Sequence, residues 1–121
     1  MTIEGYKRSQ RVASRMREEL MLLLRNLSDP RLTGAIITRV DLTDDLAFAR
    51  VHVRQELLAP DDAAQKRMLR GFEAASSRLR QQVGRALGLR HAPELRFMYD
   101  SGQDAAMRVE EILREIARDK G

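Results

Sequence analysis

The stretch AASSRLRQQVGRALGLR, residues 74–90, contains four arginines and no acidic side chain. If it is helical, Arg78 and Arg85 fall within about 20° of one another, and the apolar Leu79 and Val83 lie on the other side. Arginines that have no carboxylate to pair with are suited to contact the phosphates of a nucleic acid. The pattern favours such contacts over the alternative, a charged surface that only keeps the protein soluble.

Residues that could carry out catalysis are isolated from one another. His52 and His91 are the only histidines, and nothing near them has the spacing of a metal cluster. We expect both at the surface, His52 on the exposed face of a strand and His91 in the loop before Pro93. Ser76 and Ser77 have no adjacent base, and no glycine-rich phosphate loop is present. The adjacent acidic pairs suit turns and helix caps. The sequence therefore predicts no catalytic residue, no cofactor, no metal and no small-molecule substrate.

Composition predicts one domain over residues 1–121, with the last few residues disordered. Apolar residues make up 43% of the chain and charged residues 33%, as in globular proteins. There are 22 Lys and Arg residues against 18 Asp and Glu residues, a net charge of +4. No apolar run is long enough for a membrane span, no signal peptide is apparent, and cysteine is absent. We expect a cytoplasmic protein with no membrane partner, and a monomer because no exposed heptad seam is apparent.

The apolar spacing predicts an amphipathic helix over 8–27 that ends near Ser28, because Asp29 precedes Pro30. A second helix opens with Asp61 or Asp62 as its N-cap. The expected buried stripe of the first helix is Val12, Met16, Leu20, Leu23, Leu24 and Leu27, and that of the second is Ala64, Met68, Phe72 and Ala75. The polar sides carry Arg8, Arg11 and Arg15, and Lys66, Arg67 and Arg70.

The adjacent serines predict a break in the second helix at Ser76 and Ser77. A third helix then follows and stops at Gly88. Its buried stripe is expected to be Leu79, Val83, Ala86 and Leu87. A last helix is predicted over about 103–118, burying Ala105, Val109, Ile112, Leu113 and Ile116.

Three strands complete the prediction. The runs 35–43 and 46–54 alternate and should form an antiparallel hairpin around the turn residues Thr43, Asp44 and Asp45. The first run sets Ile36, Thr38, Val40 and Leu42 against Ile37, Arg39 and Asp41, and the second is expected to bury Ala47, Ala49, Val51 and Val53. A third strand, 94–99, places Leu95, Phe97 and Tyr99 on one face. This order predicts a two-layer α+β domain.

Two common modes of nucleic-acid binding do not suit this chain. There are only five aromatic residues, and Phe72 and Phe97 are expected in the core, so base stacking is not the main mode. A helix-turn-helix reader would not follow a β-hairpin. What remains is a helix-break-helix unit whose cations contact the nucleic-acid backbone.

Four segments carry a resemblance to a known family. They are RVASRMREEL at 11–20, DPRLTG at 29–34, VDLTDDLAFARVHV at 40–53 and GRALGLRHAPELRFMYD at 84–100. In this order and spacing, the chain resembles the ribosome-binding factor A family along nearly its whole length. The resemblance implies a single KH-like domain of type II topology, α-β-β-α-kink-α-β, with a C-terminal helix.

The family resemblance also bears on the predicted break. The family has a short Ala-x-Gly kink between two helices, and here the matching residues are Ala75, Ser76 and Ser77, with serine in place of glycine.

The resemblance implies a non-enzymatic factor that binds free, immature 30S subunits and 16S rRNA. It would assist 5′-end maturation of the rRNA and matter most in the cold. The candidate RNA-binding residues are Arg8, Arg11, Arg15, Arg31, Lys66, Arg67, Arg70, Arg78, Arg80, Arg85 and Arg90. Two alternatives remain: a stress factor on mature ribosomes, or an adaptor that presents Arg39, Arg50, Arg54 and Arg96 to an acidic protein.

Overall fold

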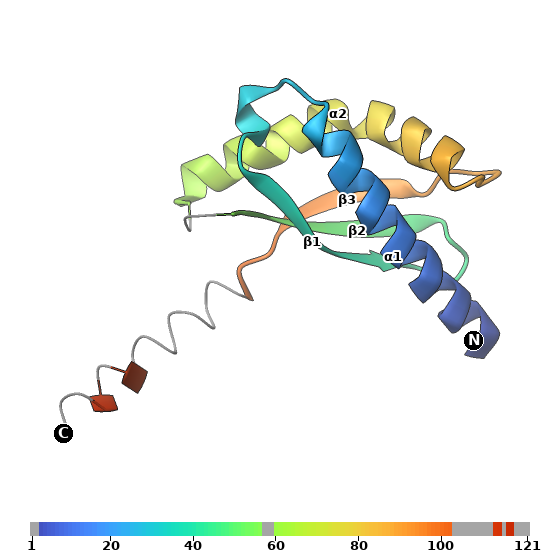
Figure 1. Ribbon diagram of the computed structural model, residues 1–121, viewed down its shortest axis with the longest axis horizontal. Helices are drawn as coiled ribbons and strands as arrows, with labels where there is room; N and C mark the ends of the chain where they lie inside the picture. The colour runs from blue at the N-terminus through green and yellow to red at the C-terminus, as the bar shows by residue number, and fades with distance from the viewer. Residues whose placement is uncertain (1–2, 57–59, 103–112, 115, 118–121) are drawn as a thin grey trace.

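The computed structural model describes residues 3–56, 60–102, 113–114 and 116–117. In chain order its elements are α1 (Ile3–Arg25), the 3₁₀ turn η1 (Pro30–Leu32), β1 (Ala35–Leu42), β2 (Phe48–Gln55), α2 (Asp62–Ala86) and β3 (Glu94–Tyr99). Both helices lie on one side of a three-stranded sheet (Figure 1). The predicted two-layer α+β class is therefore confirmed.

The sheet has the order β1-β2-β3, so β2 is its central strand. β1 and β2 form the predicted antiparallel hairpin, whereas β3 runs parallel to β2. Parallel neighbours need a crossover connection, and α2 supplies it. In the hairpin turn, Thr43 Oγ1 donates to Asp45 Oδ1 at 2.7 Å and accepts from the Phe48 amide at 3.1 Å.

The predicted alternation in the first strand is wrong beyond its third residue. The pairing with β2 shifts between Ile37 and Arg39, which leaves Thr38 as the extra residue of a β-bulge. Ile37 and Val40 consequently both face the core, although strict alternation places them on opposite faces. A bulge depends on the partner strand, so periodicity within β1 alone does not reveal it.

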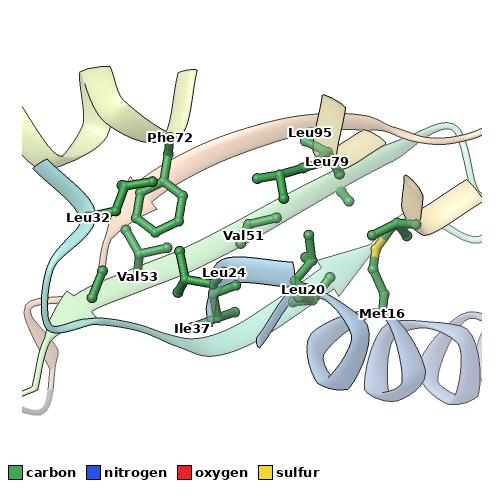
Figure 2. Close-up of a cluster of buried hydrophobic side chains, with 14 of the residues drawn as sticks. Met16, Leu20, Leu24, Leu32, Ile37, Val51, Val53, Phe72, Leu79 and Leu95 are labelled. Atoms are coloured by element: carbon green, nitrogen blue, oxygen red, sulfur yellow. The ribbon is translucent and has the colours of Figure 1, made fainter. Parts of the chain in front are cut away.

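The core fills the space between the helices and one face of the sheet. Figure 2 shows Met16, Leu20 and Leu24 of α1 pointing toward β2 and α2. The Phe72 ring of α2 has no exposed surface and stacks on Phe97 of β3, with 5.0 Å between ring centres. The predicted buried stripes are confirmed except near their ends. Ala47 of the second predicted strand and Ala64 and Ala86 of α2 are exposed, and Val12 of α1 is only half-buried, because these positions lie at the margins of the packed layer.

The first helix begins earlier and ends earlier than the 8–27 predicted. It ends at Arg25, and the next turn is closed by bonds from the Asn26 and Leu27 amides to carbonyls three residues earlier. Asp29 then caps η1, with its side chain accepting from the Arg31 amide at 2.9 Å. Sequence periodicity places a helix but not its frayed ends.

The predicted break at Ser76 and Ser77 is wrong, because α2 is one unbroken helix of 25 residues. Among the described non-glycine residues, only Leu46 has a positive φ, so Ala75 and both serines keep helical geometry. Serine costs a helix interior only about 0.5 kcal/mol relative to alanine, and the neighbouring residues are good helix formers. Figure 1 shows that the continuous helix still changes direction along its length.

The C-terminal end of α2 is confirmed as predicted. Leu87 is the C-cap, and Gly88 follows with φ of +64°, the left-handed conformation that glycine adopts readily. One turn earlier, Gly84 permits a close approach: a Cβ there would lie 2.8 Å from the Cβ of Ala92. The loop after α2 therefore folds back against the helix before β3 begins.

Most of the last predicted helix lies outside the described residues. This holds for Ala105, Val109 and Ile112, for the bounds near 103 and 118, and for the final residues expected to be disordered. Residues 113–114 and 116–117 are helical. However, Leu113 and Ile116 are 59% and 46% exposed, so their predicted burial is wrong: neither packs against the sheet or α2.

The continuous helix generates a test at Ser77, which is exposed within α2. Ser77→Ala should raise the free energy of unfolding and Ser77→Gly should lower it, each by about 0.5 kcal/mol, because helix propensity alone decides at such a site. Urea denaturation of the two variants measures the difference. If Ser77 instead capped a break, alanine would be the destabilising replacement and glycine the tolerated one.

Candidate nucleic-acid interface

The outer side of α2 carries a row of exposed arginines. Arg67, Arg78 and Arg85 fall within about 20° of one another around the helix axis, and Arg70 lies about 60° from that line. All four are exposed, as predicted, and they lie opposite Phe72 and the rest of the buried stripe. We call these four residues the α2 arginine face.

None of the guanidinium groups of this face has a carboxylate within 4.0 Å among the described residues. Within the described part of the chain, the ion pairs within 4.0 Å involve other residues. Lys66 and Arg90 are also exposed and likewise lie outside those pairs. A cation that already has a carboxylate partner must lose it before binding phosphate, whereas these cations are available at no such cost.

Arg80 differs from its neighbours, although it too is exposed. Its Nε and Nη2 donate to the Ala92 carbonyl at 3.1 and 2.9 Å, which ties the loop after α2 to the helix. Arginine has five donors, so part of this guanidinium remains for a ligand. The residue was predicted only as an RNA contact, and the structure adds a role in holding the loop.

Arg31 is the second candidate with an internal partner. Its Nε and Nη2 donate to the two carboxylate oxygens of Asp29, the closest contact being 2.7 Å. The hydrogen bonds from Arg31 lower the pKa of Asp29, and the pKa of Arg31 is raised by the same pairing. The pair is largely neutral and braces η1, so Arg31 offers less net charge to phosphate than the α2 arginine face does.

A second basic strip lies on α1. Arg8, Arg11 and Arg15 are exposed and fall within about 60° around the helix axis, opposite the buried Met16 and Leu20. α1 and α2 cover the same side of the sheet, so both basic surfaces belong to the helical layer (Figure 1). The structure thus brings the predicted cations into two separate strips on one layer.

No helix among the residues that the structure describes covers the opposite face of the sheet. Along β2 it presents Phe48, Arg50 and His52, which alternate with the buried Ala49 and Val51. The four arginines predicted for an acidic partner, Arg39, Arg50, Arg54 and Arg96, all belong to these strands. We call this surface the open sheet face.

The histidines and acidic residues form no metal site in the described residues, where no three such side chains lie together. His52 was predicted as an exposed surface residue, but its side chain is only 13% exposed. Its Nε2 lies 2.9 Å from Asp41 Oδ2, and Arg39 contacts the other oxygen of that carboxylate at 3.2 Å. His91 is exposed in the loop before Pro93, as predicted. No helix among the described residues has the length and apolar character that crossing a membrane requires.

One side chain was missed by the sequence analysis as a candidate contact. Phe48 is 44% exposed on the open sheet face, and Arg96 lies over its ring with 5.6 Å from the guanidinium carbon to the ring centre. The sequence signal that could have identified it is the alternation of β2, which places Phe48 on the same face of the strand as the polar Arg50 and His52.

Asp100 joins the end of β3 to the bulge in β1. Its Oδ2 accepts a 2.7 Å hydrogen bond from Thr38 Oγ1, and its amide donates to the Val53 carbonyl at 2.7 Å. The hydrogen bond from Thr38 lowers the pKa of Asp100 below its ordinary value of 3.8, against the opposing effect of burial. A lowered pKa means that ionised Asp100 stabilises the fold, and that this contribution disappears as the pH falls through the lowered value.

Thr38→Val should therefore raise the pKa of Asp100 toward its ordinary value, as followed by NMR titration of the carboxyl carbon. The variant should be less stable than the parent at neutral pH, because the folded-state preference for the ionised carboxylate is lost. Below the lowered pKa the two proteins should approach one another in thermal stability. A stability difference that stays constant down to about pH 2 would assign it to packing rather than to this hydrogen bond.

The topology and charge distribution define a KH-like α+β domain of type II order with basic outer helix surfaces. A family model described as ribosome-binding factor A matches residues 8–113. The chain belongs to the ribosome-binding factor A family.

Individual relatives agree with this assignment. The chain is 57% identical over 110 residues to ribosome-binding factor A of Sorangium cellulosum, covering 91% of this chain and 89% of the relative. The solution structure of a ribosome-binding factor A from Thermotoga maritima superposes with a TM-score of 0.68 at 30% identity, covering 78% of this chain and 89% of the other.

A third relative has been placed in a larger assembly. Thermus thermophilus ribosome-binding factor A, as fitted into a cryo-electron microscopy map of its complex with the 30S subunit, matches with a TM-score of 0.59 at 25% identity. The match covers 73% of this chain and 90% of that one.

Proposed function

We propose that this chain is a non-enzymatic assembly factor that binds the free 30S subunit through 16S rRNA. The observation that carries the proposal is the α2 arginine face, whose exposed guanidinium groups have no carboxylate partners in the described residues. Membership of the family and the 30S complex of the Thermus relative support the same partner.

The mechanism follows from how these cations are held. The core side of α2 is anchored by Phe72, Leu79 and Val83, so the helix presents Arg78 and Arg85 from a rigid support. Arginine contacts to phosphates position a protein on RNA without reading its sequence. Recognition of the target then depends on the shape and folding state of the rRNA, which suits a factor that distinguishes immature from mature subunits.

The candidate contacts differ in expected weight. Arg67, Arg70, Arg78, Arg85 and the α1 strip should contribute most, together with Lys66 and Arg90. Arg80 and Arg31 should contribute less, because part of each guanidinium already bonds within the protein.

The cellular role that we propose follows the family. The factor acts as a monomer in the cytoplasm, assists maturation of the 5′ end of 16S rRNA, and leaves before the subunit enters translation. The need for it is greatest at low temperature. No cofactor, metal or small-molecule substrate takes part.

Charge reversal on α2 tests the binding surface. Arg78→Glu with Arg85→Glu should abolish co-sedimentation with purified 30S subunits, since the local charge changes by four units where phosphates should lie. Thermal stability should change by only about 0.5 kcal/mol per surface substitution. The matched control, Arg78→Lys with Arg85→Lys, keeps the charge and should retain most of the binding, with an affinity that still falls log-linearly with salt.

A double Glu variant that melts normally and sediments with subunits as the parent does would show that the α2 arginine face is not the RNA contact.

Depletion of the protein in its host tests the assembly role. Free subunits and 16S rRNA with unprocessed 5′ ends should accumulate, most strongly at low temperature. Sucrose-gradient fractions of the parent strain should contain the protein with free small subunits. Its presence on whole ribosomes would indicate a factor of mature particles, and its absence from all ribosomal fractions would indicate an adaptor.

A further inference from the structure

The open sheet face contains a hollow near the β1–β2 turn. Its volume is about 440 Å³, within the range of small-ligand pockets. The hollow is lined by Asp41, Leu42, Thr43, Phe48, Ala49, Arg50 and Arg96, so all three strands contribute. The lining combines the apolar ring of Phe48 with the charged side chains of Asp41, Arg50 and Arg96.

The strand register sets the charged side chains in one row. Asp41 pairs with Arg50, and Arg50 pairs with Arg96 on the next strand. Asp41 is already engaged by Arg39 and His52, and Arg96 lies 3.9 Å from Glu94. Arg50 has no acidic partner within 4.0 Å in the described residues, so it is the available cation of the hollow.

The ring and the neighbouring guanidinium form a stacked pair. The Arg96 guanidinium carbon lies 5.6 Å from the centre of the Phe48 ring, and both side chains are exposed. Unpaired RNA bases stack on aromatic rings and on the planes of arginine guanidinium groups, and the phosphates of the same nucleotides bind nearby cations. Phe48 and Arg96 supply the stacking surfaces, and Arg50 supplies the cation.

We propose that this hollow binds one unstacked nucleotide of single-stranded RNA, with its base on the Phe48–Arg96 pair and its phosphate on Arg50. Thr43 and Asp41 also line the hollow, and their polar side-chain atoms are already bonded within the protein. The site lies on the face of the sheet opposite the helices, so it is separate from the α2 arginine face.

The charges of the open sheet face favour RNA over a protein partner. Four arginines stand against three carboxylates, which leaves a positive surplus on the open sheet face: Arg39, Arg50, Arg54 and Arg96 against Asp41, Glu94 and Asp100. This face has two exposed large apolar side chains, Phe48 and Met98. Phe48 lies beside Glu94 and Met98 lies beside His52, and the Arg50–Arg96 pair lies between them, so they form no continuous apolar patch. A hydrophobic protein interface would need a contiguous apolar patch.

This inference extends the proposed function, because a small-subunit factor would meet single-stranded rRNA, but its test is independent of subunit binding. The full-length protein is titrated into labelled hexauridylate, and into an abasic hexamer with the same backbone, with fluorescence anisotropy as the readout. Phe48→Ala should weaken hexauridylate binding about 10-fold and leave abasic binding unchanged, since stacking requires the base. Arg50→Gln should weaken binding to both probes.

Two further variants control for structure. Met98→Ala removes the other exposed apolar side chain of the same face, outside the hollow, and should bind hexauridylate as the parent does. Phe48→Tyr keeps a stacking ring and should restore binding.

The inference is overturned if the parent does not bind hexauridylate, if Phe48→Ala binds it as the parent does, or if Phe48→Ala weakens the abasic probe equally. Binding of a hexaglutamate peptide that depends on Phe48, without RNA binding, would assign the hollow to an acidic protein instead. If the double Glu variant of α2 loses subunit binding while Phe48→Ala binds hexauridylate as the parent does, the proposed function stands and this site does not. If Phe48→Ala loses hexauridylate binding while the double Glu variant binds subunits normally, this site stands and the α2 arginine face is not the contact with the subunit.

Discussion

Ala49, Val51 and Val53 have no exposed surface, and their burial fixes β2 at the centre of the sheet. β2 pairs antiparallel with β1 through a short turn and parallel with β3 through a crossover. The crossover obliges α2 to cross the covered face, where Phe72 and Leu79 pack over the strands. The outward orientation of the α2 arginines is therefore a consequence of how β2 is buried.

The same constraint gives the molecule two surfaces with different electrostatic character. On the helical layer the arginines of α2 have no carboxylate within 4.0 Å among the described residues. Screening by salt in the solvent then sets how far their attraction for a phosphate extends. On the open sheet face, residues two apart on the same strand bring carboxylates next to arginines, as Asp41 does for Arg39 and Glu94 does for Arg96. The helical layer thus suits long-range attraction to phosphate, and the sheet suits short-range contacts whose geometry is defined by strand register.

Serine at position 77 shows how a family pattern and a particular sequence can differ. The resemblance predicted a kink in which this chain has Ser77 in place of a glycine, and a glycine there would lower the cost of leaving helical geometry. With serine, the chain forms one helix, and its arginines stay aligned along the helix axis across the position of the predicted break. The bend visible in Figure 1 is then distributed along a hydrogen-bonded helix and is not a loop.

The sequence by itself located the three strands and the polar sides of α1 and α2, although it predicted a break within α2. The 3.6-residue and two-residue periods locate buried stripes without knowledge of the partner element, and Asp61 and Gly88 mark the ends of α2 by local backbone chemistry. The third strand, 94–99, was located to the residue, and the exposure of Arg78 and Arg85 followed from the same periods.

Only the tertiary structure decided which cations are available for binding and which residues share a face. Arg80 bonds to the carbonyl of Ala92, twelve residues away, because the loop folds back on Gly84. The bulge at Thr38 reverses the facing of β1, and the neighbouring strands bring Arg96 over Phe48. Hydrogen bonds and ion pairs act over about 3–4 Å, and at that range the neighbours of a side chain are set by segments distant in sequence, which no local period encodes.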